Sequence, residues 1–351
     1  MTSTLLARSR PRRVARGLSV AILFGAFAAL MLPAAVGAAA EPGRLIAAPR
    51  DTVGHHDLAN WTNERIAPVR AAPAPASRTA ATFQVTYIAG PNAWPTAART
   101  AFARAVSIIR TRIHSSQVIK VRAVWKNLGS SSGILGGARA TSNWLGTNNR
   151  VFPVSTQEAR CACNKNGTGS EIYSEFNAQY PNWYFGTNAN PPSNKYDFVT
   201  TVLHELIHGL GFYSSFYVSG ANGGWGYTDG TPPPTYKNRF DSYEWNQAAG
   251  GLKLARGSSY PNDSPALRAQ LTDGSVYLES PNVTAFLSGA RAELYAPNPW
   301  RPGSSNSHWG EAAFPPGNSS AMMTPFLSNG EAIHNPGGLA VALLKDIGWP
   351  V

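Results

Sequence analysis

Cysteine and charge are scarce in this chain of 351 residues. Its two cysteines, Cys161 and Cys163, exclude a disulfide framework, which needs several pairs. Because one residue separates them, they could form a local clip, stay a free dithiol or stand in an incidental turn, and catalysis by cysteine ranks last. Charged residues make up 14% of the chain, against 33 glycines, 27 prolines and 10 tryptophans. We therefore expect a loop-rich secreted protein.

The chain has no acidic side chain before Glu41. Five arginines, at positions 8, 10, 12, 13 and 16, precede an apolar run at 18–32 and a small-residue stretch at 38–40. This order is typical of a secretory signal peptide, so we predict that residues 1–40 are removed on export. The alternative is an uncleaved membrane anchor, but the run is shorter than the roughly 20 residues that span a bilayer.

The predicted signal peptide carries much of the net charge of +11. Without its five arginines, 25 basic residues remain against 19 acidic ones, and the resulting +6 is spread along the sequence. Such a distribution does not indicate a phosphate-backbone-binding face, so we expect no nucleic-acid partner. We also expect a monomer without stable membrane association after signal cleavage.

Regular patterns begin at Thr82. Alternating apolar residues predict strands at 83–87 and 119–125, and helical spacing from Phe102 to Ile113 predicts a helix that starts near Pro95. Strand, helix, strand is typical of a crossover unit in a mixed sheet. The fold class that we expect for the chain is α+β. Further strands are expected at 134–138, 151–154 and 171–176, and a final docked helix at 337–349.

Residues 201–211 read TVLHELIHGLG. In a helix that begins near Asp197 as its N-cap, His204 and His208 stand one turn apart on the same side, where two imidazoles can share one metal ion. Glu205 projects about 100° round the helix, where a carboxylate can take a proton from metal-activated water. Apolar residues gather on the opposite side, at positions 199, 203, 206 and 210. The pattern predicts a zinc hydrolase.

A catalytic zinc usually has three protein ligands and an open position, so one more donor is needed. The histidine candidates are His114, His308 and His334, of which His114 has a structural role at the end of the first helix. Asp241 and Glu244 are acidic candidates, because zinc peptidases of another class take a glutamate from a later helix. The residue types alone leave this choice open.

Residues 41–80 are rich in alanine, proline and arginine and have no period that would bury a face. We expect a linker or a short pro-segment. His55 and His56 lie within it. A pro-segment histidine that caps the metal is conceivable, but a solvated pair is the preferred interpretation.

The segment HELIHGLGF at 204–212 resembles the start of the metzincin signature, with Gly211 where the chain must turn sharply after the helix. Most metzincins have a histidine three residues later, where this chain has Ser214. Proteases of the leishmanolysin family instead place a long insert before the third histidine, which is followed by Trp and later by a Met-x-Pro segment. This chain has Ser-His-Trp at 307–309 and Met-Met-Thr-Pro at 322–325, and it resembles secreted bacterial relatives in its Leu-x-Asp-x-Gly-Trp ending at 344–349.

This resemblance covers residues 82–351, weakly in the insert. It implies a metzincin-like fold, with a mixed twisted sheet and the zinc helix in an N-terminal subdomain, 81–211, and a loop-rich C-terminal subdomain, 212–351. It also implies one Zn²⁺ with His308 as the third ligand and Met323, rather than Met322, as the Met-turn residue under the metal; calcium is left open. The dense cysteines of leishmanolysin are absent, so its disulfides and cysteine-based latency do not carry over.

The motif and the resemblance together predict a secreted zinc endopeptidase. It would hydrolyse protein or peptide substrates with Glu205 as general base. The alternatives are a zinc hydrolase of a non-peptide or cell-wall amide, a peptidase with Glu244 as ligand, and a binding protein on an inactive scaffold, against which the intact Glu205 argues.

Overall fold

The computed structural model describes residues 43–47, 54–58, 69–70, 80–90, 92–226, 236–248 and 250–351. The predicted signal peptide, residues 1–40, lies outside these ranges, as does most of 41–80. Within the described part of the chain, no helix combines the length and the apolar character needed to cross a bilayer.

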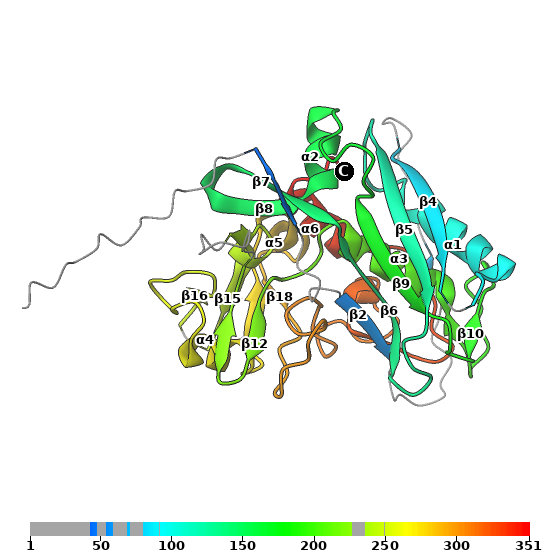
Figure 1. Ribbon diagram of the computed structural model, residues 1–351. Helices are drawn as coiled ribbons and strands as arrows, with labels where there is room; N and C mark the ends of the chain where they lie inside the picture. The colour runs from blue at the N-terminus through cyan, green and yellow to red at the C-terminus, as the bar shows by residue number, and fades with distance from the viewer. Residues whose placement is uncertain are drawn as a thin grey trace, which may run out of the picture. The chain divides into compact units, whose positions relative to one another are not determined.

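The largest sheet is a six-stranded mixed sheet with the strand order β19-β2-β6-β9-β5-β4 (Figure 1). The strand β4 (Thr82–Ala89) leads through the helix α1 (Thr96–Ile109) into β5 (Val118–Lys126), which pairs with β4 in parallel. The crossover unit expected from the sequence is therefore confirmed. The strand β9 (Ile172–Asn177) extends the parallel part, and β6 (Ile134–Ala140) joins it antiparallel.

The helix α1 begins after Pro95, as predicted, but ends at Ile109, one turn earlier than the apolar spacing indicated. Ile113 is still fully buried, because the chain bends under the start of β4, where the Ala81 amide donates to the Ile113 carbonyl over 3.2 Å. His114 therefore lies beyond the helix, and its amide donates to the carbonyl of Pro350.

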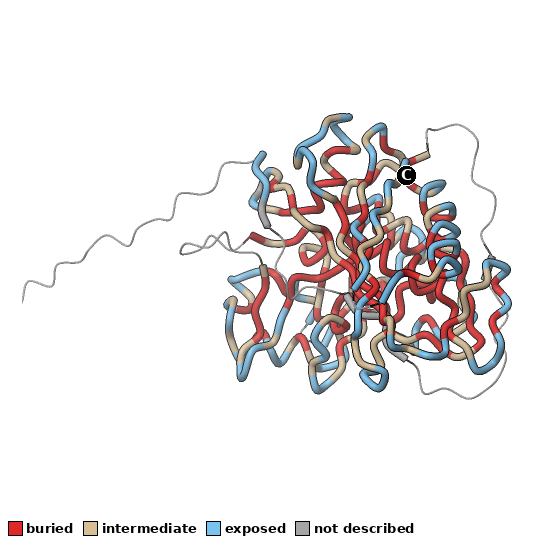
Figure 2. Tube along the Cα trace, turned by 45° about the vertical axis from the view of Figure 1, so that its right-hand side comes forward, coloured by how far each residue is buried: buried red, intermediate tan, exposed pale blue. Residues whose placement is uncertain are grey.

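The helix α3 (Phe198–Gly209) packs against α1 and against β6 and β9. All of its residues are buried, including the predicted apolar back. Asp197 is its N-cap, as expected, and accepts a 2.7 Å hydrogen bond from the Thr200 amide. Figure 2 shows that buried segments fill the interior while exposed ones follow the outer turns.

The chain after Gly211 contains short regular elements rather than loop alone. A four-stranded antiparallel sheet has the order β16-β15-β17-β18, and none of its strands exceeds three residues. Elements this short carry no periodicity, which explains why the sequence pattern was lost here. The elements are β15 (Glu244–Asn246), β16 (Leu252–Lys253), α4 (Pro265–Leu271), β17 (Val276–Leu278), α5 (Pro281–Phe286), β18 (Ala292–Glu293) and the predicted final helix, α6 (Gly338–Ile347).

A second four-stranded sheet has the order β1-β7-β8-β14, and the helix α2 (Val154–Cys161) packs on β7 and β8. At the end of α2, its last residue Cys161 forms a disulfide with Cys163, with an S–S distance of 2.08 Å. Of the three possibilities for this pair, the local clip is therefore confirmed. The strands are β1 (Leu45–Ala47), β7 (Ser142–Leu145), β8 (Arg150–Pro153) and β14 (Lys237–Asn238).

Three stretches of residues 41–80 pair with later parts of the chain. The strand β2 (Gly54–Leu58) lies between β6, which it meets antiparallel, and β19 (Phe326–Leu327), which it meets in parallel (Figure 1). The strand β3 (Val69–Arg70) pairs with β20 (Ile333–His334), and β1 pairs with β7. The three described strands are thus integrated into the sheets by backbone pairing.

The remaining short elements connect these layers. They are the pairs β10 (Trp183–Tyr184) with β11 (Tyr196–Asp197) and β12 (Tyr217–Ser219) with β13 (Asn222–Gly224), and the 3₁₀ turns Thr147–Asn149, Asp241–Tyr243 and Ala321–Met323.

Candidate metal centre

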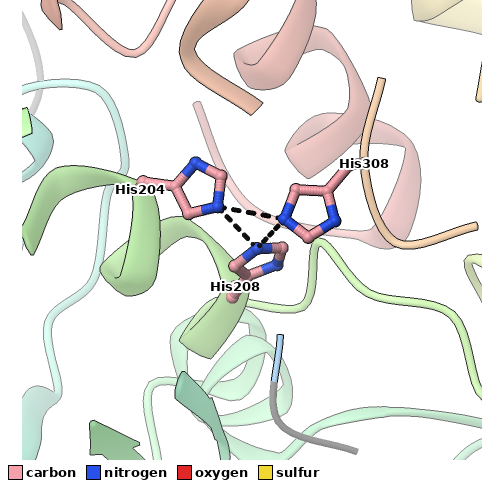
Figure 3. A group of neighbouring side chains, drawn as sticks. All are labelled: His204, His208 and His308. Atoms are coloured by element: carbon pink, nitrogen blue, oxygen red, sulfur yellow. Dashed lines mark hydrogen bonds between the residues drawn. The ribbon is translucent and has the colours of Figure 1, made fainter. Parts of the chain in front are cut away.

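Three histidines from distant parts of the chain meet in the interior, with their rings turned toward one another (Figure 3). The Nε2 atoms of His204 and His208 are 2.9 Å apart, and the Nε2 atom of His308 lies 3.2 and 3.1 Å from them. All three residues are fully buried. In the described part of the chain, this is the one group of three or more histidine, cysteine or acidic residues that could hold a metal ion.

A backbone carbonyl orients each ring. Nδ1 lies 2.7 Å from the Met322 oxygen in His204, 2.5 Å from the Phe212 oxygen in His208 and 2.8 Å from the Ser304 oxygen in His308. A carbonyl oxygen can only accept, so each Nδ1 carries a proton and donates it. In the neutral ring, Nε2 is then the nitrogen with a lone pair.

Three such lone pairs repel one another unless a cation lies between them. Tetrahedral coordination with bonds of about 2.0–2.1 Å places imidazole nitrogens about 3.3–3.4 Å apart. The observed separations of 2.9–3.2 Å are only slightly shorter. The three histidines therefore lie close enough to bind a metal ion, and they have the tautomer that ligation requires.

The turn after α3 supplies one of the orienting carbonyls. Gly211 has a φ of +113°, and a Cβ there would lie 2.7 Å from Pro153 and 2.8 Å from Ile347, so only glycine fits. The sharp turn predicted at Gly211 is thus present. This turn brings the carbonyl oxygen of Phe212 within hydrogen-bond distance of the His208 Nδ1 atom.

The loop that carries His308 is fastened to the segment that follows this turn. The Ser214 amide donates to the Ser307 hydroxyl over 3.1 Å, so Ser214 anchors the residue that precedes His308. The Trp309 ring lies 4.7 Å edge-on from the Phe212 ring. Its amide donates to the Met323 carbonyl over 2.8 Å.

Glu205 is fully buried beside His204 on α3. A Cβ on Gly136 of β6 would lie 3.4 Å from its Cγ, which places the Glu205 side chain against this strand. A buried carboxylate beside a cluster of titratable side chains is a candidate for a functional role.

The acidic candidates for the third ligand lie outside the group of three histidines. Glu244 Oε2 accepts a 3.2 Å hydrogen bond from the Asn306 amide group, and Asp241 accepts from Ser214, Ser215 and Asn238. Burial raises the pKa of Asp241 to about 6. Burial, reinforced by the charge of Asp241, raises the pKa of Glu244 well above its usual value.

The other histidine candidates also lie elsewhere. The Nε2 atom of His334 is 2.9 Å from the N-cap carboxylate of Asp197, so this buried histidine ties the start of α3 to β20. His114 lies beyond α1, outside the cluster.

Met322 and Met323 are both buried. Met322 contributes its carbonyl to His204, a contact that the sequence could not reveal because any residue has a carbonyl. The orienting role of the Phe212 and Ser304 carbonyls could not be predicted for the same reason. The one sequence signal for them is spacing, since both oxygens lie four residues from the histidines that they orient.

A family model described as SPBPB7E8-like matches residues 149–222, which include α3 with His204, Glu205 and His208. The match spans less than half of the chain and assigns it to no family. The comparisons with curated proteins and with solved structures give no match.

Proposed function

We propose that this protein is a secreted zinc-dependent endopeptidase of the leishmanolysin-like metzincin type. One observation carries the proposal: three imidazoles, each oriented by a backbone carbonyl, meet beside Glu205. Two of them and Glu205 belong to the buried helix α3, and His308 comes from a distant loop. Secretion is proposed from the sequence of residues 1–40, which lie outside the described residues.

His204, His208 and His308 would hold the metal through Nε2. Zinc in such a site acts as a Lewis acid that activates water and polarises a carbonyl group. The carboxylate of Glu205 accepts the proton from the attacking water and delivers it to the leaving amine. Met323 is proposed as an apolar floor for this centre.

The side of β6 that pairs with β2 supports peptides as the substrate class. An extended peptide can add as a strand to a sheet edge through main-chain hydrogen bonds. His56 of β2 pairs with Gly136 of β6, the residue that lies against Glu205. A peptide that took the place of β2 would therefore pass beside the proposed general base.

Cleavage of a defined peptide library tests this function. We expect new amino termini to appear with the zinc-loaded protein, to disappear after treatment with a chelator, and to return when zinc is added back. Mass spectrometry of the products gives the cleaved bonds. Persistent cleavage in the chelated protein, or no peptide cleavage in a preparation with one zinc per chain, contradicts the proposal, and the second outcome favours a non-peptide amide substrate.

A further inference from the structure

Two cavities beside β8 have a strongly basic lining. The larger, of about 340 Å³, is lined by Arg150, Arg160 and Arg239 together with Trp144 and Phe152. The smaller, of about 170 Å³, is lined by Arg150 with Lys237, Lys253 and Arg256. Arg150 belongs to both linings. Positive charge that is spread along the sequence is thus gathered here by the fold.

Acidic side chains do not balance this charge. Within the described part of the chain, the larger cavity has no acidic lining residue. The smaller one has Asp241, whose oxygens already accept hydrogen bonds from Ser214, Ser215 and Asn238. None of the six basic side chains forms an ion pair with a described residue.

Arg150 has a buried donor, its Nη1 atom, without a hydrogen-bond partner among the described residues. It stands opposite Lys237 in the parallel pairing of β8 and β14, and like charges in that position destabilise a sheet. Burial, together with the charge of Arg150, lowers the pKa of Lys237.

The C-terminal end of α6 accounts for the positions of Arg160 and Arg239 but not for that of Arg150. Arg239 Nε donates to the Asp346 carbonyl over 2.9 Å, and Arg160 lies near Gly348, so both cations face the negative end of this helix. That bond uses one of the five N–H groups of a guanidinium. Donors therefore remain for a ligand.

We infer that the larger cavity binds a phosphate or sulfate group through Arg150, Arg160 and Arg239. Guanidinium groups present paired N–H donors that match oxyanions, and charge-assisted hydrogen bonds of this kind are the strong ones. The cavity exceeds the volume of a single ion, and Trp144 and Phe152 give it apolar walls, so it has room for the carbon skeleton of an ester. This inference is independent of the proposed peptidase activity.

Isothermal titration of the full chain with inorganic phosphate and with glucose 6-phosphate tests the inference. We expect saturable binding to one site at constant ionic strength, and tighter binding of the ester if the anion is carried on a larger molecule. Equal affinities mean that the free ion is the ligand. Arg150→Gln should weaken either interaction about 10- to 100-fold, the range for loss of a hydrogen bond to a charged group.

Arg104→Gln is the matched control, because Arg104 is exposed on α1 and lines neither cavity. If circular dichroism shows that Arg150→Gln is unfolded, Arg160→Gln is titrated in its place, because Arg160 lines the same cavity. The inference is overturned if phosphate binds no better than chloride at equal ionic strength. It is also overturned if the folded cavity variants bind phosphate as tightly as Arg104→Gln does.

Discussion

Glu205 shares its buried position on α3 with two histidines, and its proposed role depends on accepting a proton. Glutamine preserves the shape of the side chain but has no basic oxygen for this purpose. We expect Glu205→Gln to keep zinc and to lower peptide cleavage by at least about 10²- to 10⁴-fold, the usual contribution of general acid–base catalysis. Initial rates on one peptide, with zinc content measured in parallel, check this. Wild-type activity in the variant would remove Glu205 from the mechanism.

Glu331 is buried and Glu311 is partly buried, and the charge of Glu331 acts on Glu311. Burial, with the charge of Glu331 as a further cause, raises the pKa of Glu311 to about 8. Burial also raises the pKa of Glu331 to about 7. In the unfolded chain glutamate ionises near pH 4.3, so between about pH 5 and 8 the folded protein binds protons that the unfolded chain has released. Stability should therefore fall as the pH rises through this window.

Thermal midpoints from pH 6 to 8.5, in the presence of zinc, test this dependence. We expect the midpoint of the wild-type protein to decrease with pH and Glu311→Gln to flatten that decrease, because glutamine does not ionise. Glu279→Gln is the control, since Glu279 is partly exposed and pairs with Arg291. If Glu311→Gln keeps the wild-type slope, the ionisation of Glu311 is not its cause.

Among the elements, α3 was the easiest to predict from the sequence. Its two histidines, its glutamate, its apolar back, its N-cap Asp197 and the turn at Gly211 all lie within a few residues, where helical periodicity relates them. The third histidine is about a hundred residues away, so no local spacing could select it. Its placement with the pair agrees with the expectation that came from family resemblance.

The strands β1, β2 and β3 show where sequence patterns fail. They are two to five residues long, and backbone pairing with strands far along the chain holds them. Hydrophobic alternation reports burial of side chains rather than such pairing. The linker or pro-segment interpretation of residues 41–80 thus missed their part in the sheets.

The strand β2 pairs with β6 where a peptide substrate would pair in the proposed mechanism. It is therefore a candidate inhibitor of the proposed peptidase. A tethered segment has an effective concentration of about millimolar, so it should exclude peptide substrates at micromolar levels. We expect a chain of residues 80–351 to cleave peptides about tenfold or more faster than a chain of residues 41–351. Equal rates, with both chains folded by circular dichroism, would show that β2 does not block the substrate.

For the whole molecule, the α+β class and the order of the main elements were predictable, whereas the contacts between residues far apart in the sequence were not. Ser214 with Ser307, Phe212 with Trp309 and His334 with Asp197 each join residues separated by more than ninety positions. No single sequence contains a pattern that pairs such residues. These contacts nevertheless bring His308 and the start of α3 to their places.

The zinc content of His308→Ala after mild chelation tests the central claim most directly. Loss of one ligand leaves two imidazoles, so the affinity for zinc should fall far more than the roughly 10- to 100-fold typical of residues that only orient ligands. Glu244→Ala and His334→Ala are the controls, with folding checked by circular dichroism. We predict stoichiometric zinc in the wild-type protein and in both controls, and almost none in folded His308→Ala. Stoichiometric zinc in His308→Ala together with its loss from Glu244→Ala would contradict the three-histidine centre.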